Sequence, residues 1–156
     1  MRVLLDTNVV LDLLLARKPF LHAAAEVFGL VEQSRVEGLL CATTVTTVDY
    51  LLTQALPRPA ARQALRKLMA LFEIAPVNRA VLEEALKSKV SDFEDAVLEQ
   101  AGWLAGAEVI VTRDQRDFRL ARLKVLGPDE FLASLPKLDA PQGGPRPDDG
   151  SAAPSA

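Results

Sequence analysis

The sequence predicts an α/β protein built on a parallel sheet with helices on both faces. Two observations support this prediction. Short apolar runs typical of buried strands alternate with longer segments of helical spacing, and the alternation has the spacing of β-α-β units. Apolar residues make up 49% of the 156 residues, which is enough for the core of one domain and excludes a disordered chain.

The first half of the chain supplies three of the predicted strands. The apolar run at 3–5 ends at Asp6, and the others are 39–44 and 74–77. The segments between and after these strands have apolar residues at helical spacing, with Pro19, Gly38 and Pro57 near their ends. They predict helices over 9–15, 20–36, 46–56, 60–72 and 80–88.

The second half completes the pattern. A helix is predicted over 92–104, followed by a clearly apolar strand at 109–112, a short strand at 124–126 and a last helix at 128–135. From residue 136 the composition changes to Pro, Gly, Asp, Ser and Ala. We therefore expect a domain over 1–135 and a disordered tail over 136–156.

Several kinds of protein are excluded by what the sequence lacks. One cysteine (Cys41) and one histidine (His22) leave no internal disulfide and no Cys- or His-based metal cluster. The longest apolar run, 9–16, is interrupted by Asp12 and is far shorter than the roughly 20 residues of a membrane span. The N-terminal residues do not resemble a signal peptide, so we expect a soluble, cytoplasmic protein without a membrane partner.

Acidic residues gather where the strands of the predicted sheet end. Ligands of parallel α/β sheets bind at this edge. The polar residues expected there are Asp6, Asp49, Asp92, Asp95, Thr112, Asp114 and Asp117. So many carboxylates would repel one another without a cation, and oxygen ligands without His or Cys indicate Mg²⁺ or Mn²⁺. Taken singly, each acid other than Asp6 also has a structural interpretation: Ser91 and Glu94 fit a capping box, and Asp92 suits a helix N-terminus.

Four segments resemble motifs of the PIN-domain ribonucleases, a family that includes VapC-type toxins of bacterial toxin–antitoxin pairs. Residues 4–15 (LLDTNVVLDLLL) look like the opening motif and 91–96 (SDFEDA) like the third acidic motif. Residues 109–118 (VIVTRDQRDF) look like the fourth, and 125–132 (VLGPDEFL) like the closing segment. The resemblance implies a PIN-like three-layer sandwich with a central parallel sheet flanked by helices.

The resemblance also implies roles for individual residues. Asp6 matches the first metal-binding acid and Asp49 the second, a position that is often Glu in the family. Asp95 matches the third acid, with Asp92 assisting, and Asp114 the fourth, with Asp117 as a rival. Asn8 and Thr112 match polar positions that support the site. We expect Asp6, Asp49, Asp95 and Asp114 to be catalytic.

The activity implied by the resemblance is hydrolysis of RNA phosphodiester bonds with Mg²⁺ or Mn²⁺, leaving a 5′-phosphate and a 3′-hydroxyl. It makes the chain an endoribonuclease and the toxin of a type II toxin–antitoxin pair. A cognate antitoxin and a homodimer are the expected protein partners. One alternative is a PIN scaffold without catalytic activity that binds RNA or a protein. A phosphatase or receiver domain is a weaker alternative, since Asn8 and Lys124 do not match the residues those domains need.

The charge distribution is compatible with RNA. Setting aside the five acids at 6, 49, 92, 95 and 114 changes the net charge from −3 to +2. Arg113, Arg116, Arg119 and Arg122 recur every third residue around the fourth acidic motif, and we expect the first three to contact phosphates. Arg58, Arg62, Arg66 and Lys67 share one side of a helix, where a solvated face is an equally good interpretation.

Overall fold

Five parallel strands form the centre of the structure, a computed structural model that describes residues 1–136. The strands are β1 (Arg2–Leu5), β2 (Glu37–Cys41), β3 (Glu73–Ala75), β4 (Val109–Val111) and β5 (Lys124–Leu126), and their order across the sheet is β3-β2-β1-β4-β5. The predicted parallel sheet is confirmed. The predicted tail lies outside the described residues except for its first residue.

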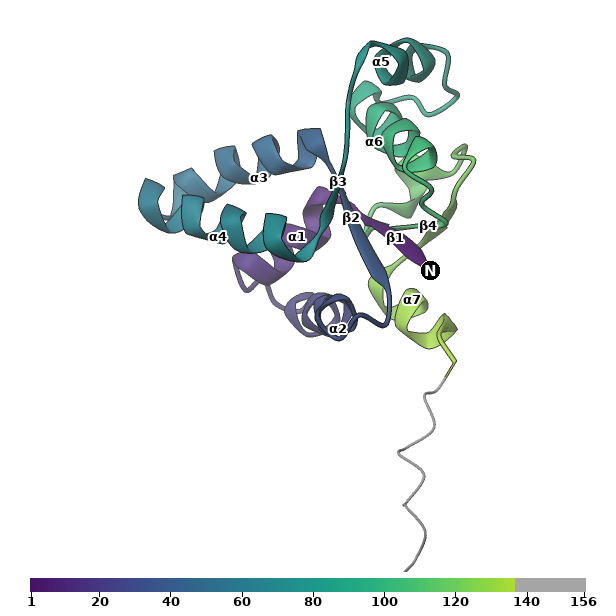
Figure 1. The fold of residues 1–156 in the computed structure, drawn as a ribbon. Coiled ribbons are helices and arrows are strands. Elements are labelled where there is room, and N and C mark those ends of the chain that lie inside the picture. The colour runs from purple at the N-terminus through teal and green to yellow at the C-terminus, as the bar shows by residue number, and fades with distance from the viewer. Residues whose placement is uncertain (137–156) are drawn as a thin grey trace, which may run out of the picture.

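Helices cover both faces of the sheet (Figure 1). One face packs against α1 (Thr7–Leu14), α2 (Leu21–Glu32), α3 (Ala42–Ala55), α4 (Arg58–Leu71) and α7 (Pro128–Ser134). The other packs against α5 (Arg79–Leu86) and α6 (Phe93–Leu104). The predicted three-layer sandwich is therefore confirmed.

The sequence of β1 shows why the sheet needs cover on both faces. Val3 and Leu5 belong to the core under α1 to α4, while Leu4, between them, belongs to the core under α5 and α6. All three are at most 1% exposed, since alternate side chains of a strand point to opposite faces. Gly102 of α6 lies so close to Leu4 that an added Cβ would come within 2.5 Å of it, which holds α6 tightly on β1.

The register of β1 and β4 determines which residues meet at the carboxyl edge of the sheet. Leu5 of β1 lies opposite Val111 of β4, and the Asp6 N–H donates to the Val111 carbonyl at 3.0 Å. The next residues along the two strands, Asp6 and Thr112, therefore emerge side by side at the carboxyl edge of the sheet. Two residues 106 positions apart in the chain are brought together by strand pairing alone.

Several predicted boundaries differ from the structure, most clearly those of β2 and α2. The second strand was predicted to reach residue 44, but it ends at Cys41 and α3 begins at Ala42. The β-branched Thr43 and Thr44 favour a strand by propensity, yet the buried Thr44 packs as part of α3 and its hydroxyl contacts that of Thr7 at 3.3 Å. The predicted helix 20–36 ends earlier, at Glu32, and a 3₁₀ turn, η1 (Gln115–Phe118), was not predicted.

Within residues 1–136, no helix has both the length and the apolar character needed to cross a membrane.

Candidate active site

Asp6 occupies the centre of the candidate site. It follows β1 directly and is the N-cap of α1, with its Oδ1 accepting the Thr7 N–H at 2.7 Å. Only 8% of the residue is exposed. Its Oδ2 accepts the Thr112 hydroxyl at 2.7 Å, across the β1–β4 junction. The strand end, the helix start and the neighbouring strand therefore all fix one carboxylate.

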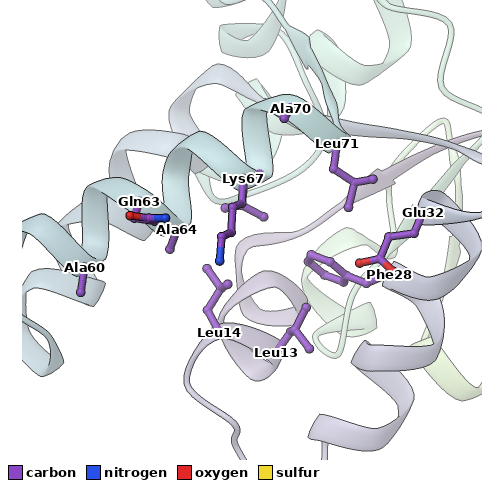
Figure 2. Close-up of a pocket in the computed structure, with 11 residues that line it drawn as sticks. Leu13, Leu14, Phe28, Glu32, Ala60, Gln63, Ala64, Lys67, Ala70 and Leu71 are labelled. Atoms are coloured by element: carbon purple, nitrogen blue, oxygen red, sulfur yellow. The ribbon is translucent and has the colours of Figure 1, made fainter.

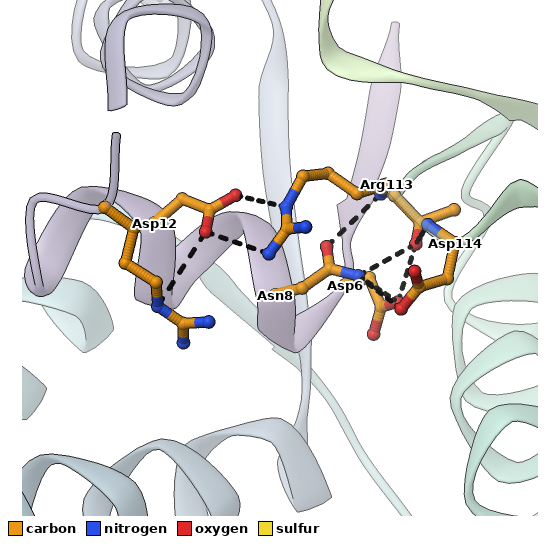
Figure 3. A network of polar contacts seen from close by, with 7 residues as sticks. Asp6, Asn8, Asp12, Arg113 and Asp114 are labelled. Carbon is orange, nitrogen blue, oxygen red and sulfur yellow. Dashed lines mark hydrogen bonds and ion pairs between the residues drawn. The ribbon is translucent and has the colours of Figure 1, made fainter. Parts of the chain in front are cut away.

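Asn8 links Asp6 to the fourth acidic motif (Figure 3). Its side-chain amide nitrogen lies 3.4 Å from Asp6 Oδ2 and 3.1 Å from Asp114 Oδ2, and its amide oxygen accepts the Arg113 N–H at 3.3 Å. Thr112 completes the network, because its hydroxyl oxygen also accepts the Asp114 N–H at 3.0 Å. The structure thus brings Asp6, Asn8, Thr112 and Asp114 together at one edge of the sheet, and their predicted roles stay predictions.

The N-terminus of α6 supplies the third acidic motif. Asp92, rather than the predicted Ser91, is the N-cap: its Oδ1 accepts the Asp95 N–H at 3.0 Å. Asp and Ser are comparably good caps, so two adjacent candidates cannot be ranked from sequence. Asp95 lies in the first turn of α6, with its side chain toward the acids of β1 and η1, as their effect on its pKa shows.

The electrostatics of the acids show that they share one region. Burial, together with the negative charges of Asp6, Asp92, Asp117 and Glu94, raises the pKa of Asp95 to about 7. Burial also raises the pKa of Asp6, opposed by its hydrogen bonds from Thr112 and Thr7. The charge of Asp114 thus acts on Asp6, and that of Asp117 acts on Asp95. Glu94, which the sequence marked only as a capping residue, also contributes charge.

Asp49 lies apart from this group. It is in the third turn of α3, further from the helix start than expected because α3 begins at Ala42. Its Oδ1 binds the Arg62 Nε of α4 at 3.1 Å, and its charge is not among those that raise the pKa of Asp6 or Asp95. The structure therefore does not join Asp49 to the acids at the end of β1.

The donor chemistry fits a hard divalent cation. Within residues 1–136, Asp6, Asp95 and Asp114 form no ion pair with Lys, Arg or His, so their oxygens are available for a cation. Burial and the charges of neighbouring acids both raise the pKa of Asp95. A cation bound among these carboxylates would offset their negative charge. In the same residues no three acidic, His or Cys side chains are already gathered around one cation position. Binding a cation there needs side-chain rotation.

The four regularly spaced arginines have two different environments. The guanidinium of Arg113 is bound by Asp12, and that of Arg122 donates to Gln100 Oε1 at 2.5 Å and lies 4.5 Å from the centre of the Trp103 ring. Arg116 and Arg119 are exposed. Both line a groove of about 240 Å³ that also includes Lys89 and Asp117. The phosphate contacts of Arg113, Arg116 and Arg119 stay predictions.

Asp12 is the polar residue that sequence analysis missed, since it appeared there only as a break in an apolar run. It is completely buried in α1 and makes two contacts with the Arg113 guanidinium, at 2.6 and 3.1 Å. Removing one partner of such a pair typically costs about 3–5 kcal/mol, because the other charge stays buried. A charged residue in the middle of an apolar helix is the only sequence signal of this pair.

A second surface feature is an apolar groove between α1, α2 and α4 (Figure 2). Its volume is about 770 Å³, and its apolar lining includes Leu13, Leu14, Phe28 and Leu71. Glu32 and Lys67 are its charged lining residues. None of the predicted site acids lines it, so this groove is separate from the acidic site.

Comparison with known proteins supports the fold. No curated protein matches the chain. Among solved structures, VapBC2 from Rickettsia felis, bound to a DNA fragment from its promoter, aligns with a TM-score of 0.65 at 11% identity, over 81% of this chain and 98% of that one. A toxin–antitoxin complex from Klebsiella pneumoniae aligns with a TM-score of 0.62 at 22% identity, over 81% and 97%. FitAcB from Neisseria gonorrhoeae aligns with a TM-score of 0.62 at 20% identity, over the same shares.

The family itself is identified from the sequence. The family model described as PIN domain matches residues 2–116, which include β1 to β4 and every acid of the candidate site except Asp117. The chain belongs to the PIN domain family.

Proposed function

We propose that this protein is a Mg²⁺-dependent endoribonuclease and the toxin of a type II toxin–antitoxin pair. One observation carries the nuclease proposal: the buried Asp6 carboxylate is held by Thr112 and Asn8 beside Asp114 and faces Asp95, at the carboxyl edge of a parallel sheet. PIN domains are generally nucleases, and this donor set suits a hard cation. Manganese is the expected substitute for magnesium.

Each residue has a distinct task in this proposal. Asp6, Asp95 and Asp114 hold the cation, with Asp92 and Asp117 adding negative charge around them. Bound Mg²⁺ supplies an activated water and a positive charge for the phosphate oxygens. Asn8 and Thr112 fix the orientation of the carboxylates through hydrogen bonds. The reaction then needs no side-chain nucleophile, and the products are a 5′-phosphate and a 3′-hydroxyl.

The RNA strand is proposed to follow the groove that Lys89, Arg116 and Arg119 line. These side chains lie next to Asp117, whose charge reaches Asp95, so a phosphate bound by them is close to the acids. Removing one phosphate-binding side chain weakens binding about equally for all RNA sequences and lowers the salt dependence by about one counterion. Titration of Lys89→Ala and Arg116→Ala with RNA at several salt concentrations measures this effect.

The experiment that tests the nuclease uses purified wild type, Asp6→Asn and the matched control Glu26→Gln, whose carboxylate lies on α2 beside His22. Each is incubated with pooled cellular RNA in Mg²⁺, Mn²⁺ and EDTA. We expect cleavage by wild type and Glu26→Gln that needs the metal, and none by Asp6→Asn. Cleavage by a well-purified Asp6→Asn protein would overturn the proposal, and end mapping of the products would identify the RNA target.

One observation favours the alternative of a PIN scaffold without activity: Asp49, the second expected acid, is bound to Arg62 instead of facing Asp6. A scaffold predicts that wild type binds no divalent metal. Calorimetric titration with Mn²⁺ separates the two functions, because the nuclease needs a metal that Asp6→Asn fails to bind.

An antitoxin is the proposed protein partner, and the apolar groove between α1, α2 and α4 is the proposed docking surface. The similar structure from Klebsiella pneumoniae is a toxin–antitoxin complex. A groove of this size with Leu and Phe side chains suits the apolar face of a helix. We expect Ala64→Arg, which fills the groove, to abolish co-purification with the product of the adjacent gene.

The matched control for the docking surface is Met69→Arg on the exposed side of the same helix. It should co-purify normally. Equal co-purification of both variants would place the antitoxin elsewhere. Homodimerisation is a separate proposal, and light scattering of the isolated protein tests it.

A further inference from the structure

Asp12 and Arg113 form a buried ion pair between two segments that carry the acidic site. Asp12 has no solvent exposure and lies in α1, six residues after Asp6. Its Oδ2 binds Arg113 Nε at 2.6 Å and its Oδ1 binds Arg113 Nη2 at 3.1 Å, so the planar guanidinium is held by two parallel contacts (Figure 3). Arg17 Nε lies 3.8 Å from Oδ1 and adds a weaker contact.

Phe20 completes the environment of Arg113. The guanidinium carbon lies 3.8 Å from the centre of the Phe20 ring, so the cation is bound at its edge by Asp12 and on its face by an aromatic ring. Phe20 is the N-cap of α2, Asp12 is in α1, and Arg113 follows β4. One side chain therefore joins three segments, and only a quarter of it is exposed.

The backbone of Arg113 connects this ion pair to the acids. The Arg113 N–H donates to Asn8 Oδ1, and this contact sets which end of the Asn8 amide faces the site. The amide nitrogen of Asn8 is then directed at Asp114 Oδ2 and at Asp6 Oδ2. Arg113 also lies between Thr112 and Asp114 in the chain, so a shift of its backbone moves both of them.

From this geometry we propose that Asp12 and Arg113 are positioning residues of the acidic site. Their ion pair fixes the loop 112–114 and the Asn8 amide, and thereby the separation of Asp6 and Asp114. The proposal deepens the proposed metal-dependent nuclease and rests on it. The role differs from the phosphate contact expected of Arg113, because moving its guanidinium to a phosphate would leave Asp12 buried without its partner.

The test must separate positioning from stability. Replacing Arg113 alone leaves a buried charge, so the central variant is the double substitution Asp12→Leu/Arg113→Met, which replaces the pair by apolar side chains of similar size. Such replacements typically preserve folding stability. Arg113→Lys is the conservative variant that keeps the charge and loses the two parallel contacts. Arg122→Met is the matched control, since Arg122 anchors the next part of the same connection but does not contact Asn8.

Three measurements are made on each protein: thermal stability, Mn²⁺ affinity by electron paramagnetic resonance, and hydrogen exchange of residues 112–114 in EDTA. We expect the double variant to unfold at close to the wild-type temperature, yet to bind Mn²⁺ about 10- to 100-fold more weakly, the usual effect of losing support behind metal ligands. We expect its exchange at 112–114 to be at least about tenfold faster, since the backbone there loses its anchor. Arg113→Lys should be intermediate and Arg122→Met unchanged.

The possible outcomes are distinguishable. Wild-type Mn²⁺ affinity and wild-type exchange in the double variant would show that the pair is structural only and would overturn the proposal. If wild type itself binds no Mn²⁺, the proposed nuclease function fails. In that case the exchange data in EDTA still decide whether the pair orders the loop. If the double variant does not fold, Arg113→Lys gives the same comparison in a protein that retains the charge.

Discussion

On the β1–β4 side of the acidic site, Asp114 accepts a hydrogen bond from Asn8, and Asp6 accepts one from Thr112. The ion pair of Asp12 and Arg113 lies next to them. On the α6 side, the carboxylate of Asp95 accepts no hydrogen bond from residues 1–136 and has a pKa of about 7. The first side is ordered by the fold itself, while the second holds a carboxylate whose negative charge is unfavourable there. We propose from this comparison that one half of the site is prebuilt and that a bound cation would complete the other.

The largest expected effect comes from testing which acid after β4, Asp114 or Asp117, belongs to the prebuilt half. Asp114 contacts Asn8, whereas Asp117 acts on Asp95 only through its charge. We expect Asp114→Asn to lower the cleavage rate by about 100-fold or more, since the loss of a metal ligand costs several kcal/mol of transition-state stabilisation. Asp117→Asn should lose less than about tenfold. Single-turnover RNA cleavage measures both, and the reverse order would make Asp117 the fourth acid.

The next test removes one hydrogen bond of the prebuilt half. Thr112 is fully buried, and its hydroxyl donates to Asp6 and accepts from Asn8 and Asp114. Thr112→Val leaves these buried groups short of a partner, so we expect the free energy of unfolding to fall by about 1–3 kcal/mol.

Urea denaturation checks the Thr112→Val prediction. Thr53→Val is its control, because the Thr53 hydroxyl contacts only an exposed carbonyl of its own helix. A similar decrease in the free energy of unfolding in both variants would mean that the buried hydrogen bonds of Thr112 contribute no more than an exposed one.

The α6 side is tested by pH. Asp95 titrates near pH 7 in the folded protein and near 3.8 in the unfolded chain, so between these values the folded state binds more protons. Its contribution to stability is therefore present below about pH 4 and is lost as the pH rises toward 7. We expect the melting temperature in EDTA to fall between pH 5 and 8 in wild type and to fall less in Asp95→Asn, with Asp6 still contributing. Equal slopes in the two proteins would contradict the assigned pKa.

The smallest effect concerns Asp49. Its partner Arg62 is half-exposed, so Arg62→Ala should change the unfolding free energy by less than about 1 kcal/mol. If loss of Arg62 lets Asp49 turn toward the site, the affinity for Mn²⁺ should increase by at most about fivefold. That factor corresponds to the free energy of the exposed ion pair. Adding Asp49→Asn to Arg62→Ala should abolish the gain. Unchanged affinity in Arg62→Ala would indicate that Asp49 is not a ligand.

The fold and the prebuilt half were largely predictable because their signals are local. Runs of three apolar residues mark β1, β2 and β4, and runs of two mark β3 and β5. The positions of Asp6, Thr112 and Asp114 follow from where β1 and β4 end. The start of α3 was harder to predict, because the strand propensity of Thr43 and Thr44 is outweighed by packing in the folded protein. The choice between Ser91 and Asp92 as the N-cap depends on backbone angles that a sequence does not display.

The features that the sequence did not reveal concern pairs of residues that are distant in the chain. Asp49 binds Arg62 from another helix, and Asp12 binds Arg113 across 101 positions. The local sequence around Asp12 or Asp49 does not identify the arginine that it binds. A buried acid in an apolar helix does indicate that some cation must meet it, so Asp12 could have been marked as paired without knowing with what.

The position of β1 in the sheet has a consequence for how the protein is made. β1 leaves the ribosome before the other four strands of this sheet, yet it pairs with β4 as well as with β2. Asp6 therefore meets Asn8 at once, but meets Thr112 and Asp114 only after more than a hundred further residues have been synthesised. A nascent chain carries its first acid throughout synthesis and acquires a complete acidic site only near the end. Under the proposed function, a ribosome making this protein is thus not exposed to a finished nuclease until translation of the domain is almost over.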